Sequence, residues 1–103
     1  PINHLKDVIK VIAHHHERYD GSGYPDGLKG EEIPLLSRIL QVADAFDAMT
    51  SERPYRKVPG VERALQELKR CSGTQFDPQI VEIFIKVISY SSQTTGFEFK
   101  PQI

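Results

Sequence analysis

The chain has 103 residues, enough for one small domain with a limited core and too few for a second. Its 13 Lys and Arg residues against 14 Asp and Glu give a formal net charge of −1, which argues against a general binder of DNA, RNA or anionic membranes. The single cysteine, Cys71, cannot form an intramolecular disulfide. That favours a reducing compartment, so we expect a cytoplasmic protein.

No targeting signal is expected from the N-terminal residues. Residues 1–4 contain neither an initiator Met nor the basic and apolar regions of a signal peptide. No apolar run approaches the roughly 20 residues that span a bilayer, so no membrane segment is expected. We therefore expect the chain to begin inside a longer protein.

Residues 4–18 have the spacing of an amphipathic helix. The apolar positions that share one face are Leu5, Val8, Ile9 and Ile12. Continued at about 100° per residue, the same helix places His15 and His16 on the core side and His14 on the solvent side.

A long loop is predicted for residues 20–33, because four of the seven glycines fall there. Loops of this length in compact domains are usually functional or disordered. The apolar side chains of Tyr24, Pro25 and Leu28 favour an ordered loop held against the core.

A second helix is predicted over residues 34–50, with Pro34 in its first turn. Its apolar face comprises Leu36, Ile39, Leu40, Ala43, Phe46 and Thr50. Asp47 falls on that face and Asp44 on its edge. An aspartate among leucines needs a partner.

Two further helices complete an all-α prediction of about four helices. The third covers residues 60–71, and the fourth begins at Pro78, with Asp77 as N-cap and Phe76 placed to staple onto Val81, and continues to about residue 88. We expect a domain over residues 1–90 and a polar tail over 91–103. The apolar faces of the first and fourth helices predict self-association if nothing covers them.

Ionisable side chains suited to metal binding gather in the first two helices. His15, His16 and Asp44 offer imidazole and carboxylate ligands, and adjacent histidines suit two neighbouring ions better than one. The alternatives stay open: the histidines as structural residues bonded to backbone or to Asp47, and Asp44 as a solvated or salt-bridged carboxylate.

These residues, taken together, resemble the HD-GYP subgroup of the HD phosphohydrolases. The resemblance rests on the runs HHE at 15–17, GYP at 23–25, VADAFDAMT at 42–50, RPYR at 53–56 and GTQFDP at 73–78. It implies an all-helical HD-domain bundle and a bacterial signalling enzyme that hydrolyses cyclic di-GMP with two or three divalent metal ions, commonly iron or manganese.

The resemblance also implies site roles. His15, His16 and Asp44 match metal ligands, and Asp44 and Asp47 match catalytic positions. The residues implied on the substrate side are Asp47, Gly23, Tyr24, Arg53 and Arg56. From the residues alone, Arg53 and Arg56 are equally explained as surface charges, and Tyr24 as a loop anchor.

One departure from the family is specific: the chain contains no His-Asp dipeptide. We therefore expect the C-terminal half of a catalytic domain, inactive by itself. The alternative is a non-catalytic module that docks diguanylate cyclase (GGDEF) domains through the loop at 23–25.

Overall fold

The computed structural model describes residues 2–51 and 60–95, and their side chains within 4–51 and 60–91. Its elements are α1 (Ile2–Ala13), the 3₁₀ helix η1 (Gly30–Glu32), α2 (Leu35–Thr50), α3 (Val61–Arg70) and α4 (Pro78–Thr95). Within these ranges extended pairing is limited to an isolated bridge between Ser72 and Phe76. The all-α prediction is confirmed.

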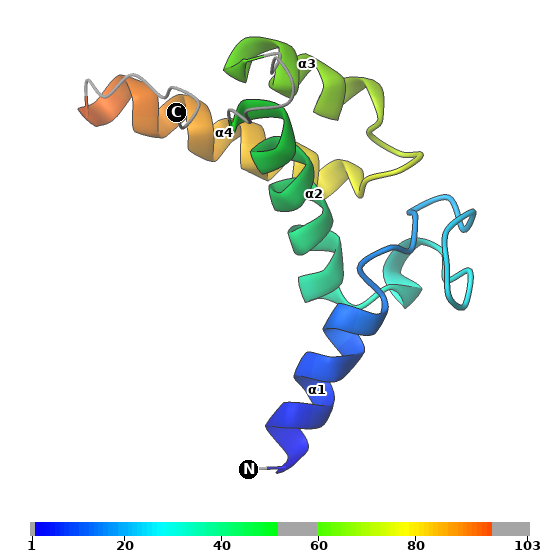
Figure 1. Ribbon diagram of the computed structural model, residues 1–103. Helices are drawn as coiled ribbons and strands as arrows, with labels where there is room; N and C mark the ends of the chain where they lie inside the picture. Colours follow the sequence, from blue (N-terminus) through cyan, green and yellow to red (C-terminus); the bar gives the residue numbers. More distant parts are fainter. Residues whose placement is uncertain (1, 52–59, 96–103) are drawn as a thin grey trace.

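The core lies where α2, α3 and α4 pack together, and α1 leads away from it (Figure 1). The buried residues of this cluster are Val42, Phe46, Ala64, Leu68, Cys71, Phe76 and Val81. Phe46 and Phe84 meet edge to face, with ring centroids 5.0 Å apart, a favoured arrangement for aromatic pairs. Helix α2 is thus the element that joins the core to α1.

The buried face of α2 differs from the predicted one. Leu36 is 61% exposed, and Asp47, expected among leucines, is exposed as well. Ser37 and Gln41 are buried instead. Hydrophobic periodicity cannot identify such residues, because their burial depends on hydrogen bonds to the backbone of another segment.

Helix α1 ends at Ala13, so the prediction that it continues to residue 18 is wrong. The amides of His15 and Glu17 bond to carbonyls three residues back, Ile12 and His14, at 3.3 and 3.1 Å. Such tight turns are frequent at helix ends. Residues 14–16 form this turn, called here the histidine turn.

The start of α4 agrees with the sequence signals, and its end does not. The amide of Gln79 donates to Asp77 Oδ1 at 2.8 Å, which confirms Asp77 as N-cap. The helix continues to Thr95, beyond the predicted end near residue 88. The division between a domain at 1–90 and a tail stays a prediction, and residues 96–103 lie outside the described part of the chain.

Apolar side chains are exposed on two helices. Those of α1 and α4 that are more than half exposed are Leu5, Val8, Ile9, Ile12, Ile83, Val87 and Tyr90. Self-association through these faces stays a prediction. No helix in the described ranges has both the length and the apolar character needed to cross a membrane.

A buried ion pair joins α2 to the start of α4. Arg38 donates to Asp77 Oδ2 at 2.8 Å, and their side chains are 11% and 3% exposed. Arg38 Nε also donates to the carbonyl of Ile33 at 2.9 Å. The end of the long loop, α2 and α4 are therefore connected through one guanidinium.

Replacement of Arg38 by Met should lower the free energy of unfolding by about 3 kcal/mol, because it leaves the Asp77 carboxylate buried without its cation. Lys86→Met is the matched control: its pair with Glu82 is exposed, and its loss should cost about 0.5 kcal/mol or less. Urea unfolding of both variants measures the difference. Equal losses would contradict the structural role of the Arg38 pair.

Candidate metal and nucleotide site

A pocket of about 450 Å³ lies where the histidine turn, the long loop, α2 and the α3–α4 connection meet. Its lining residues are His15, His16, Glu17, Arg18, Tyr24, Gln41, Asp44, Ala45 and Gln75. The two histidines and Asp44, predicted as metal ligands, thus line one pocket, together with Tyr24.

The side chain of His15 is held by the end of α1. Its Nδ1 lies 2.5 Å from the carbonyl oxygen of Ile12. A carbonyl only accepts, so Nδ1 carries a proton in this hydrogen bond, and Nε2 is the ring nitrogen left for a metal ion. Metal-binding histidines commonly donate the N–H of their second ring nitrogen to a backbone carbonyl in this way.

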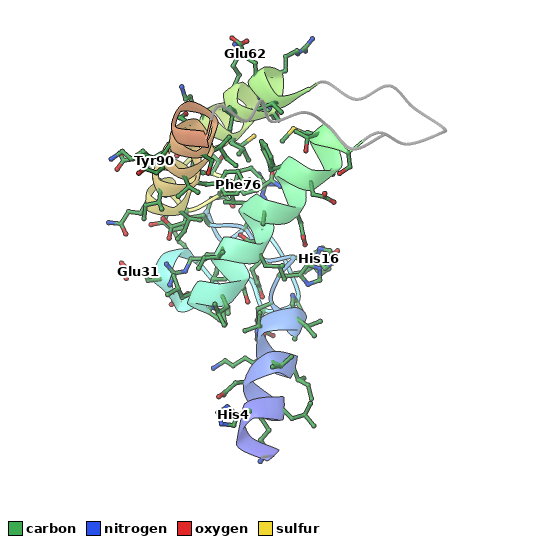
Figure 2. All side chains as sticks on the ribbon, turned by 90° about the vertical axis from the view of Figure 1, so that its left-hand side faces the viewer. His4, His16, Glu31, Glu62, Phe76 and Tyr90 are labelled. Atoms are coloured by element: carbon green, nitrogen blue, oxygen red, sulfur yellow. The ribbon has the colours of Figure 1, made fainter. Side chains whose placement is uncertain are left out.

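The aromatic ring of Tyr24 stacks on His16, with centroids 5.0 Å apart and planes at 17°. The rings of His15 and His16 are also close, 3.9 Å between centroids. His16 is exposed and His15 half-buried, and in Figure 2 His16 lies apart from the core around Phe76. The prediction that both face the core is wrong, because the helix ends before them and its rotation no longer applies.

Asp44 is exposed on α2. The ligand atoms of Asp44 and the two histidines do not all lie within 4.8 Å of one another. Donors about 2.1 Å from a single ion lie at most about 4.2 Å apart. In this arrangement the three side chains do not surround one ion, and their role as ligands of one or of two neighbouring ions stays a prediction.

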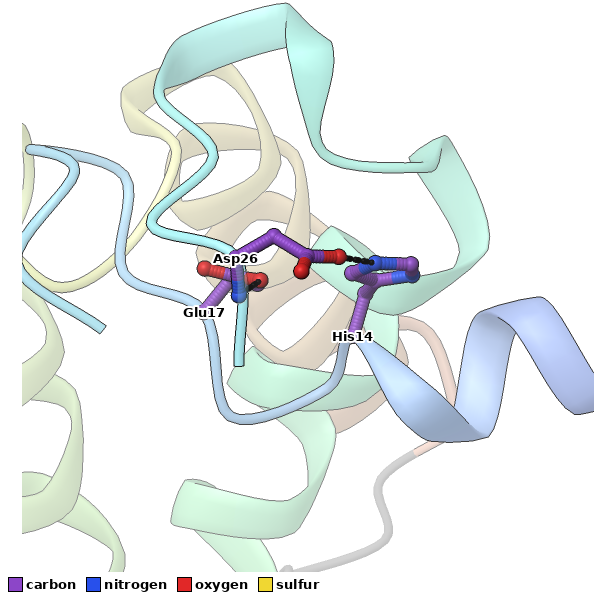
Figure 3. A group of neighbouring side chains, drawn as sticks. All are labelled: His14, Glu17 and Asp26. Carbon is purple, nitrogen blue, oxygen red and sulfur yellow. Dashed lines mark hydrogen bonds and ion pairs between the residues drawn. The ribbon is translucent and has the colours of Figure 1, made fainter. Parts of the chain in front are cut away.

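The compact ligand group within the described ranges is a different one, His14, Glu17 and Asp26 (Figure 3). His14 Nε2 contacts Asp26 Oδ2 at 2.8 Å and Nδ1 contacts the Lys10 carbonyl at 2.9 Å. The prediction that His14 faces solvent is wrong: its side chain is 13% exposed. The hydrogen bond that His14 donates to Asp26, followed by the one that it donates to the Lys10 carbonyl, raises the pKa of His14.

The carboxylate of Glu17 binds the backbone of the long loop. Its side chain is 2% exposed, and its two oxygens accept the amides of Asp26 and Leu28, each at 2.9 Å. Both carboxylate oxygens of Glu17 therefore bind loop amides. The group of His14, Glu17 and Asp26 thus fixes the loop to the end of α1. Sequence reasoning gave Glu17 no role; the available signal was an acid directly before a glycine-rich segment whose amides need acceptors.

Gly23 lets the loop approach the histidine turn. A Cβ at this position would lie 2.5 Å from Arg18 N and from His16 O, both backbone atoms. The start of the loop is bound to the α3–α4 connection. The amides of Tyr19 and Asp20 donate to the carbonyls of Gln75 and Thr74 at 3.1 and 2.8 Å. The predicted ordered loop is confirmed by these contacts.

Asp47, Arg53 and Arg56, three of the predicted site residues, are not among the described residues that line the pocket, and neither is Gly23. Asp47 is exposed outside the lining, and its Oδ1 accepts the hydroxyl of Ser51 at 2.7 Å. Arg53 and Arg56 lie outside the described residues. The roles proposed for all four stay predictions.

Comparison with known proteins assigns the family. The model of the HD domain matches residues 1–80. The chain belongs to the HD domain family. Several curated relatives are cyclic di-GMP phosphodiesterases, so the HD-GYP assignment from the sequence is confirmed.

Two relatives illustrate the similarity of this HD domain chain. A cyclic di-GMP phosphodiesterase of Thermotoga maritima is 52% identical over 78 residues, covering 76% of this chain and 21% of the relative. A cyclic di-GMP phosphodiesterase response regulator of Xanthomonas campestris is 48% identical over 95 residues, 91% of this chain and 25% of the relative. The chain thus spans about a quarter or less of these relatives.

A solved structure shares the fold. The crystal structure of a cyclic GMP-AMP specific phosphodiesterase of Vibrio cholerae superposes with a TM-score of 0.68 at 36% identity. The match covers 80% of this chain and 18% of that one. The HD domain fold is therefore supported by sequence and by structure.

Gly23→Ala should destabilise the protein by about 2 kcal/mol or more, because backbone atoms must move to admit the methyl group. Gly30→Asn is the control: nothing lies within 4 Å of a Cβ there, and its φ of 59° suits asparagine. Urea unfolding measures both. Equal effects of the two substitutions would refute the close approach at Gly23.

The pair of His14 with Asp26 should make stability depend on pH. The raised pKa of folded His14 means that the pair contributes fully below the ordinary histidine pKa, about 6.5, and is lost as pH rises through the folded pKa. Asp26→Asn should therefore destabilise the protein more at pH 5.5 than at pH 8.5. The exposed Glu31→Gln should show no such difference when unfolding is measured at both pH values.

Proposed function

We propose that the chain forms part of the active site of a cyclic di-GMP phosphodiesterase, and that the pocket binds the metal ions and one phosphodiester of the substrate. The observation that carries the proposal is the convergence of His15, His16 and Asp44 on one pocket. The names of the relatives support the substrate class.

The ligand set fits divalent metal ions. Imidazole and carboxylate together suit ions such as iron and manganese, and His15 presents Nε2 while Nδ1 is held by Ile12. Two or three bound ions would polarise water and the phosphoryl oxygens in phosphodiester hydrolysis. We propose His15, His16 and Asp44 as the ligands this chain contributes, with Asp44 and Asp47 in catalytic positions.

The other pocket residues would orient the substrate. Tyr24, stacked on His16, offers an aromatic surface beside the ligands, and Gly23 places it there. Arg18 brings a guanidinium to the same pocket, a group suited to phosphate oxygens. Arg53 and Arg56 are proposed for the same phosphate side, on the resemblance alone.

The choice between cyclic dinucleotides is a separate question. Relatives include cyclic di-GMP phosphodiesterases and 3′3′-cGAMP-specific phosphodiesterases of Vibrio cholerae, the latter 38% identical over 85 residues in one case. The higher identities to the Thermotoga and Xanthomonas enzymes favour cyclic di-GMP. Turnover of both substrates by the complete protein separates the two.

Docking of GGDEF domains through the loop is the second proposal from the sequence. Tyr24 is 61% exposed and Pro25 is exposed too, so the loop offers a surface. The stacking of Tyr24 on His16 favours the catalytic proposal.

Two further expectations stay predictions: a location in the cytoplasm, and inactivity of the isolated chain.

His15→Ala and Asp44→Ala, made in the complete protein, should lower the bound iron or manganese and reduce hydrolysis of cyclic di-GMP at least about 100-fold, because each removes a ligand. His4→Ala, an exposed histidine of α1, is the matched control and should change neither. Elemental analysis and product formation measure the outcome. Full metal content and activity in Asp44→Ala would refute the ligand assignment.

A further inference from the structure

Helix α2 holds the histidine turn at both ends through two buried side chains. Ser37 Oγ donates to the carbonyl of Val11 at 2.8 Å, and Gln41 Nε2 donates to the carbonyl of Glu17 at 2.5 Å. Ser37 is fully buried and Gln41 is 8% exposed. The segment between these carbonyls contains all three histidines of the turn.

The same face of α2 carries Asp44. Ser37, Gln41 and Asp44 are spaced four and three residues apart, so they follow one another along one side of the helix. Gln41 and Asp44 both line the pocket. The two hydrogen bonds therefore set the position of the histidine turn relative to the carboxylate on the neighbouring helical turn.

The amide of Gln41 has one defined orientation. The carbonyl of Glu17 only accepts, so Gln41 must present its NH₂ group to it. Its oxygen, Oε1, is then buried with no hydrogen-bond partner in the described part of the chain. An unpaired buried acceptor is unfavourable, so packing alone does not account for a polar side chain here.

We propose that Gln41 is a positioning residue: by its hydrogen bond to the Glu17 carbonyl it holds His15 and His16 in register with Asp44 for metal binding. This inference rests on the proposed function. Gln41 touches the backbone beside the ligands rather than the ligand atoms, so its effect passes through the histidine turn.

The deciding variant is Gln41→Met, which keeps the length of the side chain and removes the donor. It eliminates the unpaired Oε1 but leaves the Glu17 carbonyl without its partner, so the net change in stability should be small. In the complete, metal-free protein, amides of residues 14–18 should exchange with deuterium at least fivefold faster. In a calorimetric titration, Mn²⁺ should bind about 10-fold more weakly, a typical loss for a residue that orients metal ligands.

Thr50→Val is the matched control, because it removes a buried hydroxyl from the same helix. Thr50 Oγ1 donates to the carbonyl of Phe46 within α2, far along the helix from the histidine turn. This variant should leave exchange of residues 14–18 and Mn²⁺ affinity as in the wild type.

Unchanged exchange in Gln41→Met, or faster exchange with unchanged Mn²⁺ affinity, would overturn the positioning role. Wild-type protein that binds Mn²⁺ without hydrolysing a cyclic dinucleotide would refute the proposed function and leave the result for Gln41 standing. Wild-type protein that binds no Mn²⁺ would refute both.

Discussion

The buried carboxylate of Glu17 is the interaction on which the site depends. It accepts the amides of Asp26 and Leu28 in the long loop, and Glu17 is almost fully enclosed. A glycine-rich segment loses much conformational entropy on ordering. Two charge-assisted hydrogen bonds offset part of that loss and bring Tyr24 onto the ring of His16.

The backbone around Glu17 links this loop to the helices. Its carbonyl accepts Gln41 from α2, while its side chain faces the loop. Glu17 thus lies between two of the segments that line the pocket, the long loop and α2. Gly23 completes the arrangement, since any side chain there would strike the backbone of the histidine turn.

Motifs and helix signals in the sequence predicted much of this structure. The N-cap Asp77, the start of α4 and the extent of α2 follow from local chemistry, which acts within a few residues. The prediction that the first helix continues to residue 18 was wrong, and so were the side-chain directions inferred from it. His14 and His16 exchanged their expected environments because α1 stops at Ala13, and Asp47 lies on an exposed side of α2.

The sequence by itself determined the helical class, the family and the residue types of the pocket, because these depend on composition, periodicity and short motifs. Only the tertiary structure decided which of those residues meet, and it added Glu17 and Gln41, which no periodicity marks. Their roles come from hydrogen bonds to backbone groups 9 to 24 residues away. Such contacts exist only once the loop and α2 have packed against the histidine turn.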